Sequence, residues 1–326
     1  MAKPNVTGQR SDFQRVRTGL PSLDLLVANQ KTGELGYPVR TISEIYGYPG
    51  HGKSTLVQFL AGKLSSTLGY NKITVVDLEN AYDETHLVNN MTGSGFEGEI
   101  YMVPPIVKGE ERSHEVMLDE LISEIRGDET GVGILDSIGA SMSQAEIDNP
   151  IGSANWGKRS VMINQVMRKL MYYLRNTPRP KAVLCVNHQY PEMGGRGHTT
   201  PGGEGKEFAV AVRLTLWKAE TFGDGVFVVK LKAEKMRYGG TRPKATASVV
   251  IIPGIGVSPH LTVMIDAINA GLVERTKAGV IKLDGKSLGR IGTLTQKAAD
   301  GKLETFDPIM PLADKITLGE DDDTTD

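Results

Sequence analysis

Cysteine is almost absent from this sequence of 326 residues, which contains one, Cys185, and only two tryptophans. A single cysteine can form neither an intramolecular disulfide nor a cysteine metal cluster, which excludes small disulfide-rich folds and favours a reducing compartment. No run approaches the ~18 apolar residues of a membrane-spanning helix, and the first ten residues, MAKPNVTGQR, lack an apolar signal segment. We therefore expect a cytoplasmic protein that does not bind a membrane.

The net charge is also small, because 37 Lys and Arg nearly balance 39 Asp and Glu. A net charge of −2 argues against a nucleic-acid ligand. Five of the acids, however, lie in the last seven residues, so the rest of the chain carries a net charge of +3. Glycine, in contrast, is abundant, since 38 residues are about 12% of the chain against a usual ~7%. We expect glycine-rich functional loops in a mildly basic body with an acidic tail.

Apolar segments alternate with helical ones in the first two thirds of the chain. Strands are expected at 41–47, 72–79, 132–137 and 182–188. Helices are expected between them, as at 113–126 and 158–175. Such alternation predicts βαβ units and a parallel sheet, whereas the later strands without helices, at 210–217, 226–235 and 247–252, predict an antiparallel extension. The expected fold is α/β, a mostly parallel twisted sheet with an antiparallel extension and a small C-terminal lobe.

One glycine-rich segment matches the pattern GxxxxGK[ST], and it consists of Gly47, Tyr48, Pro49, Gly50, His51, Gly52, Lys53 and Ser54. It follows an apolar strand and opens a helix, so its backbone N–H groups would face phosphate oxygens. Lys53 is expected to reach the β- and γ-phosphates, and the Ser54 hydroxyl is expected to bind Mg²⁺. Thr55 completes the nucleotide-binding segment. The expected cofactors are ATP and Mg²⁺.

Acidic residues end two of the predicted strands. Asp136 ends the run GVGILD and is the expected partner of Mg²⁺ through water. Asp77 and Glu79 end KITVVDLE, and the alternation of a strand directs both to the same side. One of them is expected to polarise the attacking water as a general base. A helix cap or a loop hydrogen bond explains Asp77 equally well.

Longer stretches around these residues resemble the RecA-type strand-exchange ATPases, from about residue 18 to residue 290. The likeness rests on TGLPSLDLLV before EIYGYPGHGKSTL, on ITVVDLENAYD, GILDSIGA and AEIDNPIGSANWGKRSVMINQVMRKL, and on CVNHQY before PGGEGKEFAVAVRL. The last three resemble the first DNA-binding loop, the switch strand and the second loop. The N-terminal segment is much shorter than that of RecA, and the second loop is somewhat shorter. His188, within NHxY, stands where bacterial members have glutamine and is more similar to UvsX-like phage recombinases.

The resemblance implies catalytic roles for Glu79, Lys53, His188, Lys235 and Arg237. Glu79 would activate the hydrolytic water, and His188 would sense the γ-phosphate and control the second loop. The segment AEKMRYGG resembles a finger at subunit interfaces, so Lys235 and Arg237 would act on the ATP of a neighbour.

Asp83 and His86 correspond to residues that contact adenine in this family. A solvated loop explains His86 nearly as well. In the same way, the resemblance assigns Asp136 to the support of Mg²⁺.

DNA contacts are expected around the two loops. Residues 151–182 contain seven bases and no acid, which is the footprint of phosphate contacts. The indole of Trp156, in a glycine-flanked loop, would stack on or between bases. The expected DNA-binding residues are Trp156, Lys158, Arg159, Arg168, Met193, Arg196, Gly202 and Gly203. The second loop, MGGRGHTTPGGEG at 193–205, is too rich in glycine for a fixed structure without a ligand.

We divide the chain into an N-terminal arm and lead-in at 1–34, a RecA-like ATPase core at 35–258, a small C-terminal lobe at 259–312 and an acidic disordered tail at 313–326. The expected function is that of an ATP-dependent DNA recombinase that polymerises on single-stranded DNA and promotes homologous pairing and strand exchange in recombination and repair. Its expected partners are single-stranded DNA, homologous duplex DNA, further copies in a helical filament, and single-strand-binding and mediator proteins. The host would be a bacterial cell or a phage-infected one.

Two alternatives stay open. A hexameric RecA-fold helicase or motor is favoured by the finger motif, but the match to the first DNA-binding loop argues against it. A nucleotide-gated DNA-binding mediator would not need turnover, yet Lys53, Glu79 and Asp136 are all present.

Overall fold

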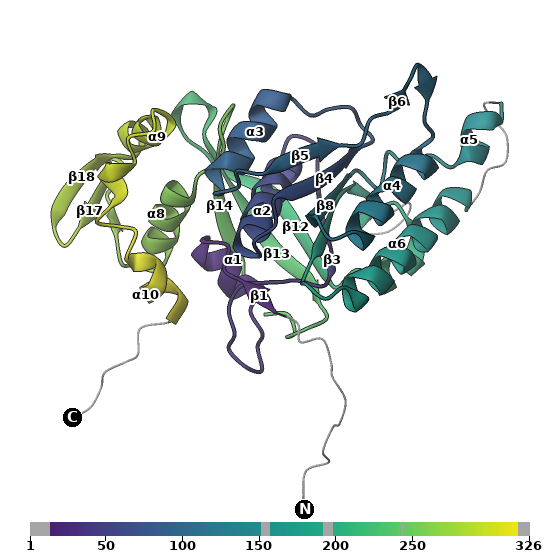
Figure 1. The fold of residues 1–326 in the computed structure, drawn as a ribbon. Coiled ribbons are helices and arrows are strands. Elements are labelled where there is room, and N and C mark those ends of the chain that lie inside the picture. Colours follow the sequence, from purple (N-terminus) through teal and green to yellow (C-terminus); the bar gives the residue numbers. More distant parts are fainter. Residues whose placement is uncertain (1–13, 151–156, 192–197, 243, 319–326) are drawn as a thin grey trace, which may run out of the picture.

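A nine-stranded sheet forms the centre of the computed structural model, which describes residues 14–150, 157–191, 198–242 and 244–318 (Figure 1). In spatial order its strands are β15 (Gly256–Val257), β14 (Ala247–Ile252), β13 (Phe227–Met236), β12 (Val212–Thr221), β3 (Ile42–Gly47), β9 (Ala182–His188), β8 (Thr130–Asp136), β4 (Lys72–Asp77) and β5 (Glu99–Met102). The six strands from β12 to β5 are parallel, whereas β13, β14 and β15 are added antiparallel. The predicted fold class is confirmed.

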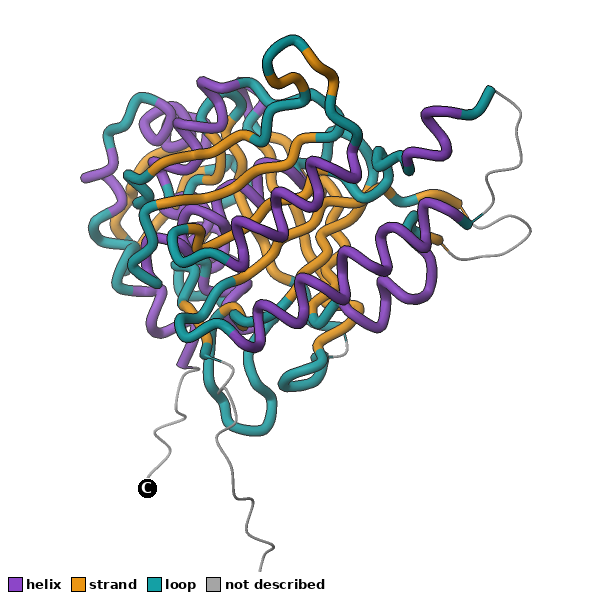
Figure 2. Tube along the Cα trace, turned by 45° about the vertical axis from the view of Figure 1, so that its right-hand side comes forward, coloured by secondary structure: helices purple, strands orange, loops and turns teal. Residues whose placement is uncertain are grey.

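Helices cover both faces of this sheet (Figure 2). One buried cluster joins the sheet to α1 (Pro21–Leu26), α2 (Lys53–Thr67) and α3 (Glu84–Gly93). The second cluster joins the opposite face to α4 (His114–Arg126) and α6 (Lys158–Asn176). The shorter helices α5 (Gln144–Asp148) and α7 (Gly203–Ala209) lie before and after α6 in the chain, and α7 packs on α6.

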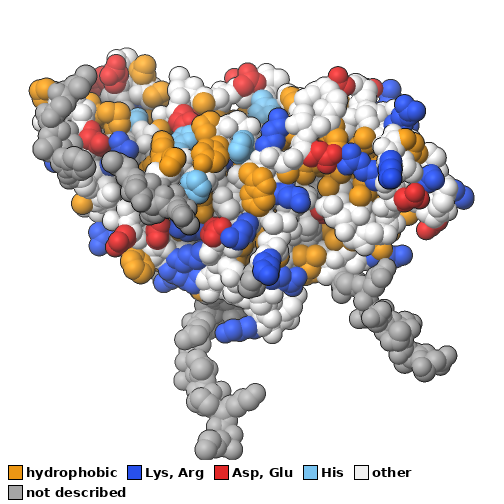
Figure 3. Space-filling view, turned by 180° about the vertical axis from the view of Figure 1, so that it is seen from behind, with side chains coloured by type: hydrophobic (Ala, Val, Ile, Leu, Met, Phe, Trp, Pro, Cys, Tyr) orange, Lys and Arg blue, Asp and Glu red, His pale blue; other side chains and the backbone are white. Residues whose placement is uncertain are grey.

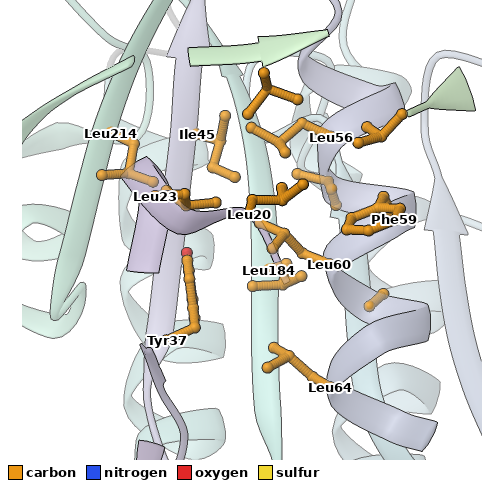
Figure 4. Packing of buried hydrophobic residues seen from close by; sticks show 14 of the residues in the cluster. Leu20, Leu23, Tyr37, Ile45, Leu56, Phe59, Leu60, Leu64, Leu184 and Leu214 are labelled. Atoms are coloured by element: carbon orange, nitrogen blue, oxygen red, sulfur yellow. The ribbon is translucent and has the colours of Figure 1, made fainter. Parts of the chain in front are cut away.

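Helix α2 is fixed to the sheet by apolar side chains at a spacing of three and four residues. Figure 4 shows them against strands β3, β9 and β12, and the side chains in contact belong to Leu56, Phe59, Leu60, Leu64, Ile45, Leu184 and Leu214. Each fully buried side chain of this size contributes about 1.5–3 kcal/mol. This packing holds the first turn of α2 directly after the end of β3.

The C-terminal lobe has its own buried cluster, which also includes Val228 of β13 and Val250 of β14. Its elements are α8 (Pro259–Asn269), β16 (Glu274–Arg275), β17 (Val280–Leu283), β18 (Lys286–Arg290), α9 (Ile291–Ala299) and α10 (Leu312–Leu318), with a 3-10 turn at Leu303–Phe306. Another 3-10 turn, Gly223–Gly225, connects β12 and β13. Helix α10 reaches into the segment that we assigned to the acidic tail.

Strands β16, β17 and β18 form a small sheet in the C-terminal lobe. Among the described residues, three two-stranded sheets pair β1 (Arg15–Val16) with β2 (Tyr37–Pro38), β6 (Ile106–Val107) with β7 (Glu110–Glu111), and β10 (Tyr190–Pro191) with β11 (His198–Thr199). Within the described ranges, no helix has both the length and the apolar character that crossing a bilayer requires.

Candidate functional site

The loop between β3 and α2 exposes backbone N–H groups because glycine occupies its critical positions. Gly52 has a φ of 85° and begins α2 without a side-chain cap. A Cβ atom on Gly52 would lie 2.4 Å from the Cδ1 atom of Ile251, and one on Gly47 would lie 2.5 Å from the carbonyl oxygen of Leu216. Neither position accepts a larger residue without movement, and the start of α2 remains open to an anion.

Lys53 and Ser54 form the first turn of α2. Lys53 is buried, and its Nζ atom donates a hydrogen bond to the carbonyl of Tyr48 over 3.0 Å. Burial lowers the pKa of Lys53, and the nearby carboxylates of Asp136 and Glu79 offset this only in part. The Ser54 hydroxyl hydrogen-bonds to Asp136. A cation and a hydroxyl thus stand where the phosphates of a nucleotide would meet the helix.

Asp136 ends β8 directly opposite Asp77, its register partner on β4. Burial raises the pKa of Asp136 to about 6, against the hydrogen bonds from Ser54 and Tyr82, which lower it. The Tyr82 hydroxyl donates to Asp136 over 2.9 Å. The position of Asp136 behind the hydroxyl of Ser54 fits the support of a hydrated Mg²⁺.

Glu79 is bound from two sides, because its Oε1 atom accepts a hydrogen bond from the Ser137 hydroxyl and lies 2.5 Å from the Nε2 atom of His188. Burial of the Glu79 carboxyl raises its pKa, but the bonds from Ser137 and His188 and the charge of Lys53 outweigh burial, so the pKa is lowered. Glu79 is therefore ionised near neutral pH and can accept a proton.

The alternation of a strand predicted that Asp77 and Glu79 point to the same side. They do not, because β4 ends at Asp77. Its carboxylate accepts hydrogen bonds from the backbone N–H groups of Glu79, Ala81 and Tyr82. Of the two explanations, the loop hydrogen bond is the one that the structure shows. Asp77 shapes the turn that holds Glu79.

Aromatic rings surround the phosphate loop. The ring of Tyr48 makes edge contacts with His51, at 5.9 Å between centroids, and with His198 of β11, at 6.0 Å. Figure 3 shows histidine side chains close to hydrophobic ones on one face of the molecule. Pro49 and Gly50 are exposed in the same loop. The Tyr48–His198 contact joins the phosphate loop to strand β11, within the second loop.

The two residues expected near adenine lie at the start of α3. Asp83 caps this helix by accepting a hydrogen bond from the N–H of His86 over 2.7 Å. The Nε2 atom of His86 lies 3.5 Å from the Oγ1 atom of Thr55 on α2. His86 therefore lies beside the nucleotide-binding segment, while the Asp83 carboxylate already has a backbone partner.

The structure does not bring Lys235 and Arg237 to the phosphate loop of their own chain. Lys235 pairs with Arg213 near the start of β12, whereas the phosphate loop follows the end of the parallel strand β3. Their side chains donate to the backbone carbonyls of Glu207 and Phe208 at the end of α7.

The ends of the two loops that we expect to bind DNA lie side by side. A Cβ atom on Gly203, at the start of α7, would lie 3.0 Å from the Ser160 hydroxyl in the first turn of α6. Gly202 has a φ of 109° and precedes this helix. Three of the expected DNA contacts, Trp156, Met193 and Arg196, lie outside the described residues.

The second loop is more ordered than we predicted, because residues 198–205 include strand β11 and the first turn of α7. The prediction of no fixed structure is wrong for this part. Lys206 holds this part of the loop in place, since this buried lysine donates to the Thr200 hydroxyl over 2.6 Å.

Four of the seven bases in 151–182 are exposed on α6, namely Lys158, Arg168, Lys169 and Arg175, and the Nε atom of Arg168 donates to the carbonyl of Asn164 over 3.3 Å. Arg159 is partly buried and donates to the carbonyl of Gly139 and to Glu146, each over 3.3 Å. Lys158 and Arg159, in the first turn of α6, directly follow the first loop in the chain, whereas Arg168 lies ten residues beyond Lys158 on the same helix.

The remaining bases, Lys169, Arg175, Arg179 and Lys181, also have partners within the chain. Lys169 forms an ion pair with Asp119 over 2.9 Å, and Arg175 donates to the Tyr238 hydroxyl. Arg179 donates to two backbone carbonyls and stacks on a tyrosine ring. Lys181 is buried and donates to the carbonyls of Ile125 and Gly127, so it adds nothing to the exposed basic surface.

Three residues that contact the candidate acids or His188 were not predicted. Ser137 bonds to Glu79, Tyr82 bonds to Asp136, and Asn187 precedes His188 and contacts its backbone N–H. Ser137 and Asn187 adjoin predicted residues in the sequence, and polar neighbours at the ends of buried strands are the signal that could have found them.

A glycine loop between a central parallel strand and a helix, with a lysine and a hydroxyl in the first helical turn and acids at the ends of neighbouring strands, defines a P-loop nucleotide-binding core. The sequence matches the RecA N-terminal domain family over residues 6–258. The chain belongs to this family.

Several curated relatives carry the name Protein RecA. The relative from Limosilactobacillus reuteri is 28% identical over 310 residues, which cover 90% of this chain and 81% of the relative. The one from Thermus thermophilus is 27% identical over 307 residues, 92% of this chain and 84% of the relative. The one from Levilactobacillus brevis is 27% identical over 270 residues, 81% and 67% of the two chains.

Proposed function

We propose that this protein is an ATP-dependent recombinase that assembles on single-stranded DNA and promotes homologous pairing and strand exchange. Membership of the RecA family supports this function. The observation that carries it is the contact between Glu79 and His188, because it joins a candidate catalytic base to the residue at the start of the second loop.

The phosphates of ATP would bind at the start of α2. Lys53 supplies a buried positive charge there, and the backbone N–H groups from Gly50 to Ser54 supply donors. Mg²⁺ would be held by the Ser54 hydroxyl, with Asp136 behind it, and would neutralise phosphate charge. Asp83 and His86 would lie near the adenine, and Tyr48, Pro49, His51 and Thr55 would border the nucleotide.

Hydrolysis would use Glu79 as the general base. Its lowered pKa keeps it ionised, so its oxygen can accept a proton from the attacking water. Ser137 and His188 orient the same carboxylate. A phosphate that displaces His188 from Glu79 would at the same time move the start of the second loop.

DNA would bind along the two loops and the first turns of α6 and α7. Lys158, Arg159 and Arg168 would contact phosphates, and Gly202 and Gly203 would allow close approach of the DNA backbone. Trp156, Met193 and Arg196 remain predicted contacts from the sequence.

The positions of the two finger residues, Lys235 and Arg237, support the assembly of several copies into a polymer. Because Lys235 and Arg237 do not lie at their own phosphate loop, we propose that they act on ATP bound to a neighbouring copy. We also propose single-strand-binding and mediator proteins as accessory partners and the cytosol as the site of action, where the single buried Cys185 stays reduced.

A strand-pairing assay tests this function. The full chain is incubated with ATP, a single-stranded oligonucleotide and a homologous supercoiled duplex, and joint molecules are counted. We expect joint molecules only with ATP and homology, their loss in Lys53→Met, and their retention in Lys63→Met, a control on the same helix. ATP hydrolysis without joint molecules, together with hexameric rings in electron microscopy, would contradict a recombinase and support a motor.

A further inference from the structure

A buried carboxylate lies behind the phosphate loop, on the strand that leads into it. Glu44 of β3 has no exposed surface, and its Oε1 atom accepts hydrogen bonds from Lys206 over 2.5 Å and from the Asn187 amide over 2.7 Å. Its Oε2 atom accepts a bond from Arg213 over 2.6 Å. One side chain thus connects three neighbouring strands and helix α7.

Asn187 connects this carboxylate to His188, the proposed phosphate sensor, which we call the switch residue, and to the second loop. Its Nδ2 atom also donates to the carbonyl of Pro201 over 2.9 Å, and its Oδ1 atom accepts from the N–H of His188 over 2.9 Å. A shift of His188 relative to β9 would therefore move the amide that holds both Glu44 and Pro201.

Lys206 connects the same carboxylate to the end of the second loop. Its side chain is fully buried, and its Nζ atom bonds to the Thr200 hydroxyl as well as to Glu44. Helix α7 is held at its far end too, because the carbonyls of Glu207 and Phe208 accept bonds from the fingers. Helix α7 therefore lies between the switch residue and the fingers.

Stability alone does not explain a charged pair at this place. A buried ion pair is often no better for stability than two apolar residues of similar volume, because both charges lose their hydration. A buried ion pair does, however, fix the relative position of the two elements that carry its side chains, because separating them would leave an unpaired charge inside the protein. Here those groups are the strand before the phosphate loop and the helix after the second loop.

We propose that Glu44, Asn187 and Lys206 are positioning residues that link His188 to helix α7, and that this link sets how strongly single-stranded DNA stimulates ATP hydrolysis. The inference rests on the proposed function and adds to it the residues that carry the coupling. None of the three needs to contact ATP or DNA.

The first test replaces Lys206 by methionine, which has a similar length and no charge. Glu44 keeps Asn187 and Arg213 as partners in this variant. Turnover without DNA and the KM for ATP should each change less than about threefold, whereas maximal stimulation by single-stranded DNA should fall about tenfold, within the usual range of coupling between two sites. The DNA concentration for half-maximal stimulation should change less than about threefold.

A second buried lysine provides a matched control. Lys181 is as buried as Lys206, but it lies at the other end of β9 and donates to backbone carbonyls. Lys181→Met should lower the thermal midpoint as much as Lys206→Met does, or more, without reducing the factor by which DNA stimulates turnover.

The double variant Glu44→Gln/Lys206→Met separates coupling from stability. It removes the charges of both Glu44 and Lys206 and leaves Arg213 with Glu207 and Thr200 as partners, so it tests the inference even where the single variant does not fold. Its stimulation by DNA should stay low. Full stimulation by DNA in the double variant, or in Lys206→Met, would overturn the link. Absence of stimulation in the unaltered protein would instead overturn the proposed function and the inference with it.

Discussion

The Nε2 atom of His188 lies 2.5 Å from the Oε1 atom of Glu79, although 109 positions separate the two residues in the chain. His188 ends β9 and leads into the second loop, whereas Glu79 follows β4, two strands away. The parallel order of the sheet brings both to the edge where α2 begins. The proposed general base and the proposed phosphate sensor are thus in direct contact.

Replacement of Glu79 by glutamine should abolish turnover while binding remains. The amide keeps the shape of the side chain but cannot accept a proton from water, and general base catalysis contributes about 10²–10⁴-fold. We expect ATP hydrolysis to fall at least about 100-fold, with ATP and single-stranded DNA affinities within about threefold of the unaltered protein. Phosphate release and two binding titrations measure this.

Glu84→Gln is the matched control, because Glu84 is an exposed carboxylate five residues further on, in the first turn of α3. Its turnover should be unchanged. Hydrolysis at the normal rate in Glu79→Gln would refute the assignment of the base.

Asp136→Asn should make the protein more stable and less active. Burial raises the pKa of Asp136 to about 6 from an ordinary 3.8, and keeping the carboxylate ionised at pH 7 therefore costs the folded state about 3 kcal/mol. Between about pH 4 and 6 the folded chain holds a proton that the unfolded chain has released, so stability falls as the pH rises through this window.

Urea unfolding at several pH values measures this effect. We expect Asp136→Asn to raise the free energy of unfolding by about 1–3 kcal/mol at pH 7, with the gain vanishing below about pH 4. Asp266→Asn is the control, because burial raises the pKa of Asp266 to about 7 and its carboxylate contacts Ser22, far from the phosphate loop in the sequence. It should gain stability without losing turnover. A less stable Asp136→Asn at pH 7 would contradict the cost of the buried charge.

The sequence predicted most reliably what local pattern controls. The segment from Gly47 to Ser54 forms the expected loop because its glycines, lysine and hydroxyl are neighbours in the chain and the flanking apolar residues define strand and helix. The order of parallel and antiparallel strands followed from the presence and absence of helices between them. These features need no knowledge of distant contacts.

Long-range contacts explain what the sequence did not predict. The glycine-rich segment 198–205 is ordered because Glu44 and Asn187, from distant strands, hold Lys206 and Pro201. Lys181 counted as a surface base, but its partners lie 54 and 56 residues away. Strand β5, with its four residues Glu99–Met102, was not predicted, since it is a short and partly exposed edge strand without a long apolar run.

The fingers should complement a defective site in a neighbouring copy. Arg237→Ala keeps its own Glu79 but lacks the guanidinium group, whereas Glu79→Gln keeps its fingers. Each variant alone should lack turnover. An equimolar mixture should recover part of it, because some Arg237→Ala sites then face the fingers of Glu79→Gln copies.

Phosphate release on single-stranded DNA measures this recovery. A mixture of Glu79→Gln with Lys53→Met is the control, since both changes damage the phosphate site itself and no site in the mixture is complete. Recovery equal to that control, or normal turnover of Arg237→Ala alone, would show that the fingers do not act between copies.

Phosphate contacts on α6 should appear as a change in salt dependence. Lys158 and Arg168 are exposed on α6, and each contact to a single strand contributes about 0.7 to the slope of log affinity against log salt concentration. We expect Lys158→Gln and Arg168→Gln each to reduce this slope by about 0.7, and the double variant by about 1.4. Fluorescence anisotropy of a labelled oligothymidine across a salt series, with a non-hydrolysable ATP analogue, measures the slopes. Lys108→Gln, an exposed lysine in the turn between β6 and β7, should leave the slope unchanged. Equal slopes for the double variant and this control would place the DNA away from α6.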